Sequence, residues 1–202
     1  MSTAATNVNV LFTHSGAKAT NTSGDVDLQL NFPSRLFTIT NNVQITNVTA
    51  PTSVFSNLLG SATLPANFWK PGMVVEAALS GRYWMGAGNL QQSNEMYYGA
   101  VLLATNHMPY FAASGAGDEW TSQFTITCLT VGASGTLHCQ GWQIIPSTVN
   151  GVSGVTKMFR LATGSGIATV DTTASTALDY KFHPGATTTA LWIHSGFAHV
   201  TP

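Results

Sequence analysis

The chain has 202 residues, which is enough for one β-domain of ordinary size or for a domain with an arm. Lys, Arg, Asp and Glu make up 7% of the residues, against about 25% in typical soluble proteins. The net charge is −1 without a basic run, and no apolar stretch approaches the roughly 18 residues of a membrane span, so we expect neither nucleic-acid binding nor membrane insertion.

Residues 1–52 are rich in Thr and Asn and carry only short apolar runs, such as 26–32 and 36–40. We interpret them as an N-terminal arm that pairs either with the following domain or with a neighbouring molecule. The first residues, MSTAATNVNVLFTHSG, lack the basic start and apolar core of a secretory signal. The boundary near residue 52 separates this arm from a second region, 53–202.

The passage 64-LPANFWKPGMVVEAALSGRYW-84 begins the domain with a corner and a long strand. Proline fixes its own backbone and donates no hydrogen bond, so Pro65 and Pro71 bracket a turn. Beyond the turn, residues with odd numbers from 73 to 83 fall on one face and those with even numbers on the other. This period of two predicts a strand with one face on a core, represented by Val75, Ala77 and Leu79.

The segments 119–131 and 136–145 repeat the alternation on either side of a Gly-Ala-Ser-Gly turn at 132–135, which predicts a hairpin. In the second segment Cys139 and Trp142 have opposite parity. A β-bulge near Gly141 would bring both onto the core face, and we predict one there.

A hairpin centred between Ala133 and Ser134 places Cys128 opposite Cys139. Three interpretations of this pair stay open. Two reduced, buried thiols come first, because nothing in the sequence implies an oxidising compartment. A disulfide is compatible with the spacing of paired strands. A metal site comes last, because no CxxC motif or nearby His completes it.

The rest of the domain offers more short strand candidates and no helix with a 3.6-residue period. The candidates are 53–59, 96–104, 155–163, 166–170, 176–182 and 188–200. About eight strands at even spacing predict an all-β fold, a jelly-roll-like antiparallel β-sandwich over 53–202 with the N-terminal arm before it.

The sequence contains no recognisable catalytic, metal or cofactor motif, and we expect a protein that is not an enzyme. Its eight carboxylates and six histidines follow no ligand spacing. Exposed aromatic side chains could instead stack on sugars or anchor a partner. We expect such contacts in or beside the predicted loops 84–96 and 106–120, from Trp84, Tyr97, Tyr98 and Tyr110.

Three pieces of the sequence resemble the small β-sandwich structural proteins of tailed bacteriophages. The pieces are GSATLPANF at 60–68 with PGMVV at 71–75 and SG at 80–81, the segment from Trp120 through VGASGT at 131–136, and TVDTTA at 169–174. The resemblance covers about 53–200. It implies a non-enzymatic capsid decoration, head fibre or tail-fibre component that is made in the host cytoplasm and resides in the virion. It further implies a homotrimer whose N-terminal segment docks on the major capsid protein or another virion protein.

Two other functions remain alternatives. A carbohydrate-binding module would recognise a host surface glycan, alone or as an added role of a virion protein. A secreted trimeric ligand of the tumour-necrosis or complement-globular type shares the jelly-roll geometry, but the missing export signal counts against it.

Overall fold

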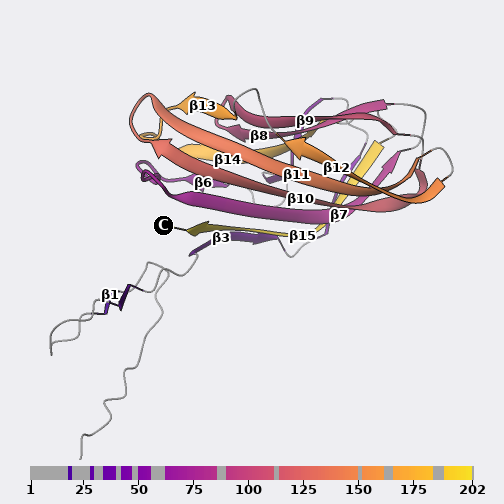
Figure 1. Ribbon diagram of the computed structural model, residues 1–202, viewed down its shortest axis with the longest axis horizontal. Helices are drawn as coiled ribbons and strands as arrows, with labels where there is room; N and C mark the ends of the chain where they lie inside the picture. The colour runs from indigo at the N-terminus through magenta and orange to yellow at the C-terminus, as the bar shows by residue number, and fades with distance from the viewer. Residues whose placement is uncertain are drawn as a thin grey trace, which may run out of the picture.

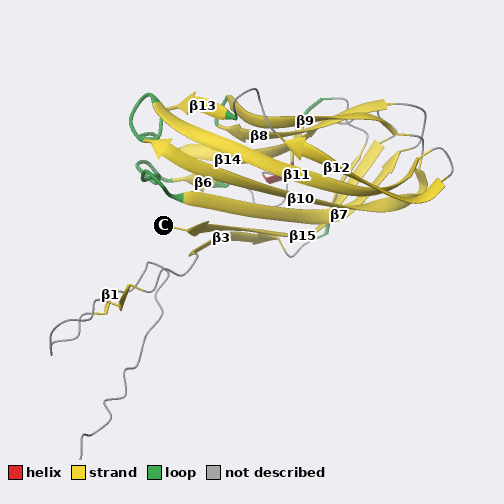
Figure 2. Cartoon of the chain, viewed as in Figure 1, coloured by secondary structure: helices red, strands yellow, loops and turns green. Residues whose placement is uncertain are grey.

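We describe a computed structural model of the chain, and Figure 2 shows that the part it describes is almost entirely strand. The described residues are 18–19, 28–29, 34–39, 42–46, 50–55, 62–85, 90–111, 114–149, 152–161, 166–183 and 189–201. Every strand pair is antiparallel. No helix among these residues is long and apolar enough to cross a membrane. The predicted all-β fold is confirmed.

Eight strands form a large sheet, in which β12-β11-β10-β7-β15-β3 are neighbours, β13 pairs with β11, and β4 pairs with β15. The bounds are β3 (Ser34–Ile39), β4 (Val43–Thr46), β7 (Val74–Met85), β10 (Ser114–Thr130), β11 (Gly135–Val149), β12 (Val152–Leu161), β13 (Ile167–Val170) and β15 (Thr189–Thr201). In Figure 1, β7, β10 and β11 run side by side along the length of the molecule.

Five strands form a small sheet, in which β5-β14-β8-β9 are neighbours and β6 pairs with β14. The bounds are β5 (Thr52–Ser53), β6 (Thr63–Leu64), β8 (Leu90–Tyr98), β9 (Val101–Phe111) and β14 (Thr176–His183). A separate pair, β1 (Lys18–Ala19) and β2 (Leu28–Gln29), belongs to neither sheet. Figure 1 shows the two main sheets as stacked layers, which is the architecture of a β-sandwich.

The core lies between the sheets and is built from alternate residues of each strand, as the period of two predicts. Val75, Ala77 and Leu79 of β7 are all buried, which confirms the predicted core face of that strand. Aromatic rings join the layers: Phe124 of β10 stacks on Tyr180 of β14, with ring centroids 5.9 Å apart and planes 10° apart.

Part of the predicted arm belongs to the large sheet. β3 and β4 both pair with β15, the last strand of the chain. The ring of Phe37 in β3 also packs edge-on against Phe55, with centroids 4.8 Å apart. Residues 34–39 and 43–46 therefore pair with the sandwich, which is one of the two interpretations of the arm. The division of the chain near residue 52 stays a prediction.

The bounds of four predicted segments are wrong. The strand candidate 96–104 spans a turn, because Gly99 takes a φ of +58° between β8 and β9. The predicted loops 84–96 and 106–120 are largely strand, since β7, β8, β9 and β10 extend into them. Both segments contain Asn, Gln and Met side chains that obscure the alternation of apolar and polar residues by which a strand is recognised in a sequence. Of the candidate 53–59, only Ser53 is strand, Val54 and Phe55 are helical, and the remainder lies outside the described residues.

Candidate functional site

One face of the large sheet points away from the small sheet, and we call it the outer face. Its side chains alternate along each strand with the buried ones, and the register aligns them in rows across the sheet. One row crosses all six neighbouring strands from β12 to β3. Its members, in order, are Arg160, Trp142, Gln123, Ala78, Phe197 and Thr38.

The first of two shallow grooves on this face surrounds Trp142, and we call it the Trp142 groove. It encloses about 300 Å³ and is lined by Gln123, Thr125, Gln140, Gly141, Trp142 and Arg160. The indole is half-buried, whereas Gln140 and Arg160 are exposed. The groove therefore offers an aromatic surface with amide, hydroxyl and guanidinium groups around it.

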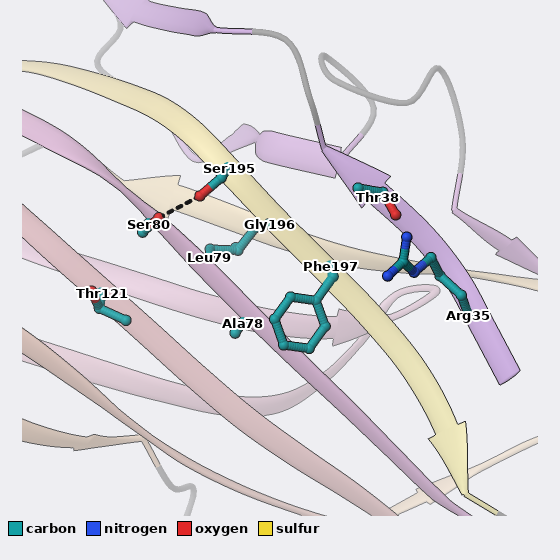
Figure 3. A pocket seen from close by; sticks show the side chains of 9 residues that line it. All are labelled: Arg35, Thr38, Ala78, Leu79, Ser80, Thr121, Ser195, Gly196 and Phe197. Carbon is teal, nitrogen blue, oxygen red and sulfur yellow. Dashed lines mark hydrogen bonds between the residues drawn. The ribbon is translucent and has the colours of Figure 1, made fainter. Parts of the chain in front are cut away.

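The second groove lies beside Phe197, and we call it the Phe197 groove (Figure 3). It encloses about 310 Å³ and is lined by Arg35, Thr38, Ala78, Leu79, Ser80, Thr121, Ser195, Gly196 and Phe197. Ser80 Oγ and Ser195 Oγ share a hydrogen bond of 2.7 Å across the β7–β15 pair. Figure 3 shows the ring of Phe197 beside Ala78, and Arg35 and Thr38 on the far side of β15 from Ser80.

The exposed ring of Phe197 is held in place by its neighbours. Phe197 is 42% exposed, and its ring stacks on that of His199, with centroids 5.6 Å apart and planes 12° apart. His199 Nε2 in turn lies 3.0 Å from Glu76 Oε2. These contacts restrict the rotation of Phe197, so its free face is a pre-formed apolar platform.

The two grooves combine aromatic rings with hydrogen-bonding side chains. Neither lining contains a carboxylate, a cysteine or a histidine, the side chains that most often act as general acids, bases or nucleophiles. Among the described residues no group of three or more His, Cys, Asp or Glu could hold a metal ion. Aromatic rings flanked by hydrogen-bonding groups suit a polar ligand that also has an apolar face.

Buried amide side chains hold β11 in one orientation and so determine which of its side chains lie on the outer face. Asn94 Nδ2 in β8 and Asn106 Nδ2 in β9 donate to Gln143 Oε1 at 2.6 and 2.9 Å. All three residues are buried between the sheets. The predicted β-bulge near Gly141 is wrong, because the β10–β11 register runs without a shift from Thr121 to Cys128. Gln143 takes the core position instead, and Trp142 points outward into its groove.

Glycine is required at 141 for close approach of the strands. A Cβ at this position would lie 2.5 Å from the carbonyl oxygen of Gln123 and 2.9 Å from the Cβ of Phe124. The absence of a side chain lets β11 run close to β10 directly beneath the Trp142 groove.

The cysteines do not face each other as predicted. Cys128 lies opposite Leu137, and Cys139 lies opposite Ile126, because the register shifts between Cys128 and Thr130. Both thiols are free and buried, the arrangement of the first of the three interpretations. Burial raises the pKa of Cys139 to about 12 and also raises that of Cys128. Such thiols are poor nucleophiles and poor metal ligands at neutral pH.

The four predicted contact aromatics do not form a site. Tyr98 is only 2% exposed and packs against Trp69 with centroids 6.2 Å apart, so its prediction as a ligand contact is wrong. Tyr97 lies on the opposite side of β8, where its OH donates to Glu95 Oε2 at 2.9 Å and Lys181 Nζ sits 4.2 Å from its ring centroid. Burial, together with the neighbouring Glu95 carboxylate, raises the pKa of Tyr97. The side chains of Trp84 and Tyr110 lie outside the described residues.

The corner at 71–75, the hairpin at 120–136 and the segment 169–174 meet at one end of the sandwich. Cys128 N donates to the carbonyl of Met73 at 2.9 Å, which joins the corner to the hairpin. Gly132 N donates to Thr172 Oγ1 at 2.8 Å, and Thr172 N donates to the carbonyl of Gly132 at 3.0 Å, which joins the hairpin to the third piece. The hairpin also exposes apolar side chains here, with Leu129 and Val131 at 43% and 47%.

Comparison with known proteins shows a distant likeness in fold alone. The sequence matches no known protein-family model and none of the curated proteins. Among solved structures, it is similar to lectin I from Ulex europaeus in complex with the methyl glycoside of α-L-fucose, with 8% identity, a TM-score of 0.33, and coverage of 82% of this chain and 97% of the lectin. It is also similar to a legume lectin-like domain from Entamoeba histolytica, with 9% identity, a TM-score of 0.28, and coverage of 78% and 83%. At such values no residue or ligand is carried over to this chain.

Proposed function

We propose that the chain is a non-enzymatic structural subunit of a tailed-phage virion, in a capsid decoration, a head fibre or a tail fibre. The observation that carries this proposal is the meeting of the three resembling pieces. Segments up to 100 residues apart in sequence, such as Met73 and Thr172, join through Cys128 and Gly132 into one hydrogen-bonded end. If the three pieces form one structural unit, this explains why the resemblance is confined to separate segments and why these keep their order along the chain.

The low charge of the chain fits a subunit whose surface is covered by partners. Only 7% of the residues are charged, so electrostatic repulsion contributes little to keeping free chains apart. The exposed Leu129 and Val131 mark the hairpin end as a surface suited to a sister subunit or another virion protein. In this proposal the chain assembles as a homotrimer after synthesis in the host cytoplasm.

Light scattering behind size exclusion tests the self-assembly. The full chain is compared with a chain of residues 34–202, which keeps β3 and the strands after it. The proposal predicts a mass near three times 21.3 kDa for the full chain and a proportional trimer for the shorter one. Monomers of both chains at micromolar concentration would contradict a trimer built by the sandwich.

A second function, glycan binding, is favoured by the Trp142 groove. An indole bordered by Gln123, Gln140 and Arg160 on an open sheet face combines a stacking surface with hydrogen-bond donors and acceptors. The virion role and this one are compatible, because host attachment requires a virion protein that binds the cell surface. Binding of the folded chain to a glycan array that is lost in Trp142→Ala would support it, and absence of any binding would refute it.

A further inference from the structure

We propose that the Trp142 and Phe197 grooves form one extended site for an acidic oligosaccharide that crosses the strands from β12 to β3. This inference rests on the proposed glycan-binding function and names its ligand class. It adds the Phe197 groove as a second subsite, and it adds Arg35 and Arg160 as the groups that recognise negative charge.

The two grooves adjoin on the outer face. Thr121 lines one and Gln123 lines the other, and these side chains lie two residues apart on the same face of β10, about 7 Å along the strand. Across the sheet, Trp142 and Phe197 are separated by three strand-to-strand steps, through Gln123 and Ala78. At about 4.8 Å a step, the two rings are about 14 Å apart. A monosaccharide cannot touch both rings, whereas an oligosaccharide can.

The residues between the rings suit a ligand lying flat on the sheet. Ala78 is short, so nothing bulky rises between Gln123 and Phe197 in that row. Hydroxyl groups border the path, with the paired Ser80 and Ser195 hydroxyls on the side of Thr121. Sugar hydroxyls can donate to and accept from such groups, while the apolar faces of sugar rings pack on Trp142 and Phe197.

The charges at the two ends favour an anionic ligand. Arg160 lies at the β12 end of the path and Arg35 at the β3 end, and both are exposed. Neither forms an ion pair with a residue of the described part of the chain. A guanidinium group can bind a carboxylate or sulfate through two parallel hydrogen bonds. The lining of neither groove contains a carboxylate, which would repel an anionic group of the ligand.

Two carboxylates of the large sheet lie near the path, and each has a basic side chain beside it or opposite it in the register. Glu76 is paired with His199 at 3.0 Å, and Glu119 lies opposite Arg82 in the β7–β10 register. Neither carboxylate lines a groove, whereas Arg35 and Arg160 do, so these two guanidinium groups are placed to meet a ligand that carries negative charges at intervals along its length.

The test is binding to immobilised hyaluronan oligosaccharides, which carry one carboxylate in every disaccharide. Short and long oligosaccharides are compared, each beside its carboxyl-reduced, neutral form. The proteins are the full chain, Trp142→Ala, Phe197→Ala and Arg35→Gln. Lys70→Gln is the matched control, because Lys70 is exposed at the corner before β7 and lines neither groove.

The unmodified chain should prefer the long acidic form over the long neutral form. Arg35→Gln should weaken binding of the long acidic form about tenfold, in line with the loss of a charge-assisted hydrogen bond, and Lys70→Gln should not. Phe197→Ala should remove the advantage of long over short. Trp142→Ala should abolish binding of all forms.

The outcomes separate this inference from the function on which it rests. If Trp142→Ala abolishes binding but Phe197→Ala, Arg35→Gln and oligosaccharide length do not change it, the extended site is overturned and the glycan-binding function is kept. Equal binding of acidic and neutral forms would overturn the ligand class. No binding of any form by the folded, unmodified chain would overturn the inference, and failure on a broad glycan array would overturn the function as well.

Discussion

Asn94 donates a hydrogen bond of 2.6 Å to Gln143 Oε1 across the core of the sandwich, and this bond ties β8 of the small sheet to β11 of the large one. With Asn106, which donates to the same oxygen at 2.9 Å, it satisfies a side chain that would otherwise be an unpaired polar group in an apolar layer. Because Gln143 faces inward, Trp142 faces outward, so a buried contact determines the composition of the surface groove.

Replacing Gln143 by Ala should lower the free energy of unfolding by about 2–3 kcal/mol, because the amides of Asn94 and Asn106 lose their buried acceptor. Urea unfolding of the variant and the unmodified chain measures this difference. Gln140→Ala, on the exposed face of the same strand, is the control and should change stability by less than about 0.5 kcal/mol. Equal effects of the two substitutions would mean that the buried amides contribute no specific stability.

Replacing Gly81 by Ala should destabilise the pairing of β7 with β15 by about 3 kcal/mol or more, since the added Cβ would lie 1.8 Å from the carbonyl oxygen of Trp192. A shift of the thermal midpoint reports the change. The neighbouring Ser80→Ala loses only one exposed hydrogen bond, to Ser195, and should cost about 1 kcal/mol or less. A Gly81→Ala protein as stable as Ser80→Ala would show that the two strands are farther apart than described.

Stability should fall in alkaline solution because of Cys139. Burial raises the pKa of this thiol from its ordinary value of 9.0 to about 12. Between those pH values the unfolded chain has released the proton and the folded chain has kept it, so the free energy of unfolding declines by up to about 1.4 kcal/mol per pH unit. Burial also raises the pKa of Tyr180, which adds to the decline.

Urea unfolding at several pH values between 8 and 11 measures this slope. Cys139→Ala should reduce the decline with pH, although its own cavity lowers stability at every pH. At pH 8 the native thiol should also resist alkylation, whereas the unfolded chain should react. If the free energy of unfolding declines with pH as steeply in Cys139→Ala as in the unmodified chain, the assignment of the decline to Cys139 is contradicted.

Sequence alone predicts the parts of this fold that depend on local pattern. The alternation of Val75, Ala77 and Leu79 identifies β7 and its buried face, and the glycine-bounded turn identifies the β10–β11 hairpin. The register of that hairpin is missed, because the shift near Thr130 follows from turn geometry that residue types do not specify.

The sequence predicts an aromatic contact surface, but not the residues of the proposed site on the outer face. Aromatic contacts were expected, but at other residues than Trp142 and Phe197. An inward glutamine violates the usual pattern of a core strand, so Gln143 is placed correctly only when its partners from β8 and β9 are known. The two grooves join residues of up to four strands, and no spacing along the sequence brings these residues together.

Two N-terminal truncations should differ in stability, because only the longer one removes β3 and β4. A chain of residues 34–202 should unfold at nearly the same temperature as the full chain. A chain of residues 51–202 lacks both strands and the Phe37–Phe55 contact. It should lose stability and aggregate, because one edge of β15 becomes unpaired. Equal stability and solubility of the two shortened chains would contradict the pairing of β3 and β4 with the sandwich.

The most direct test of the central claim is to measure the chain in purified particles. Phage particles from the strain that encodes the chain are banded, washed at high salt and digested, and its peptides are quantified against those of the major capsid protein. A virion subunit predicts a fixed, salt-resistant ratio that corresponds to a multiple of three copies per particle. Absence of the chain from infectious particles, with the protein present in the same lysate, would contradict the claim.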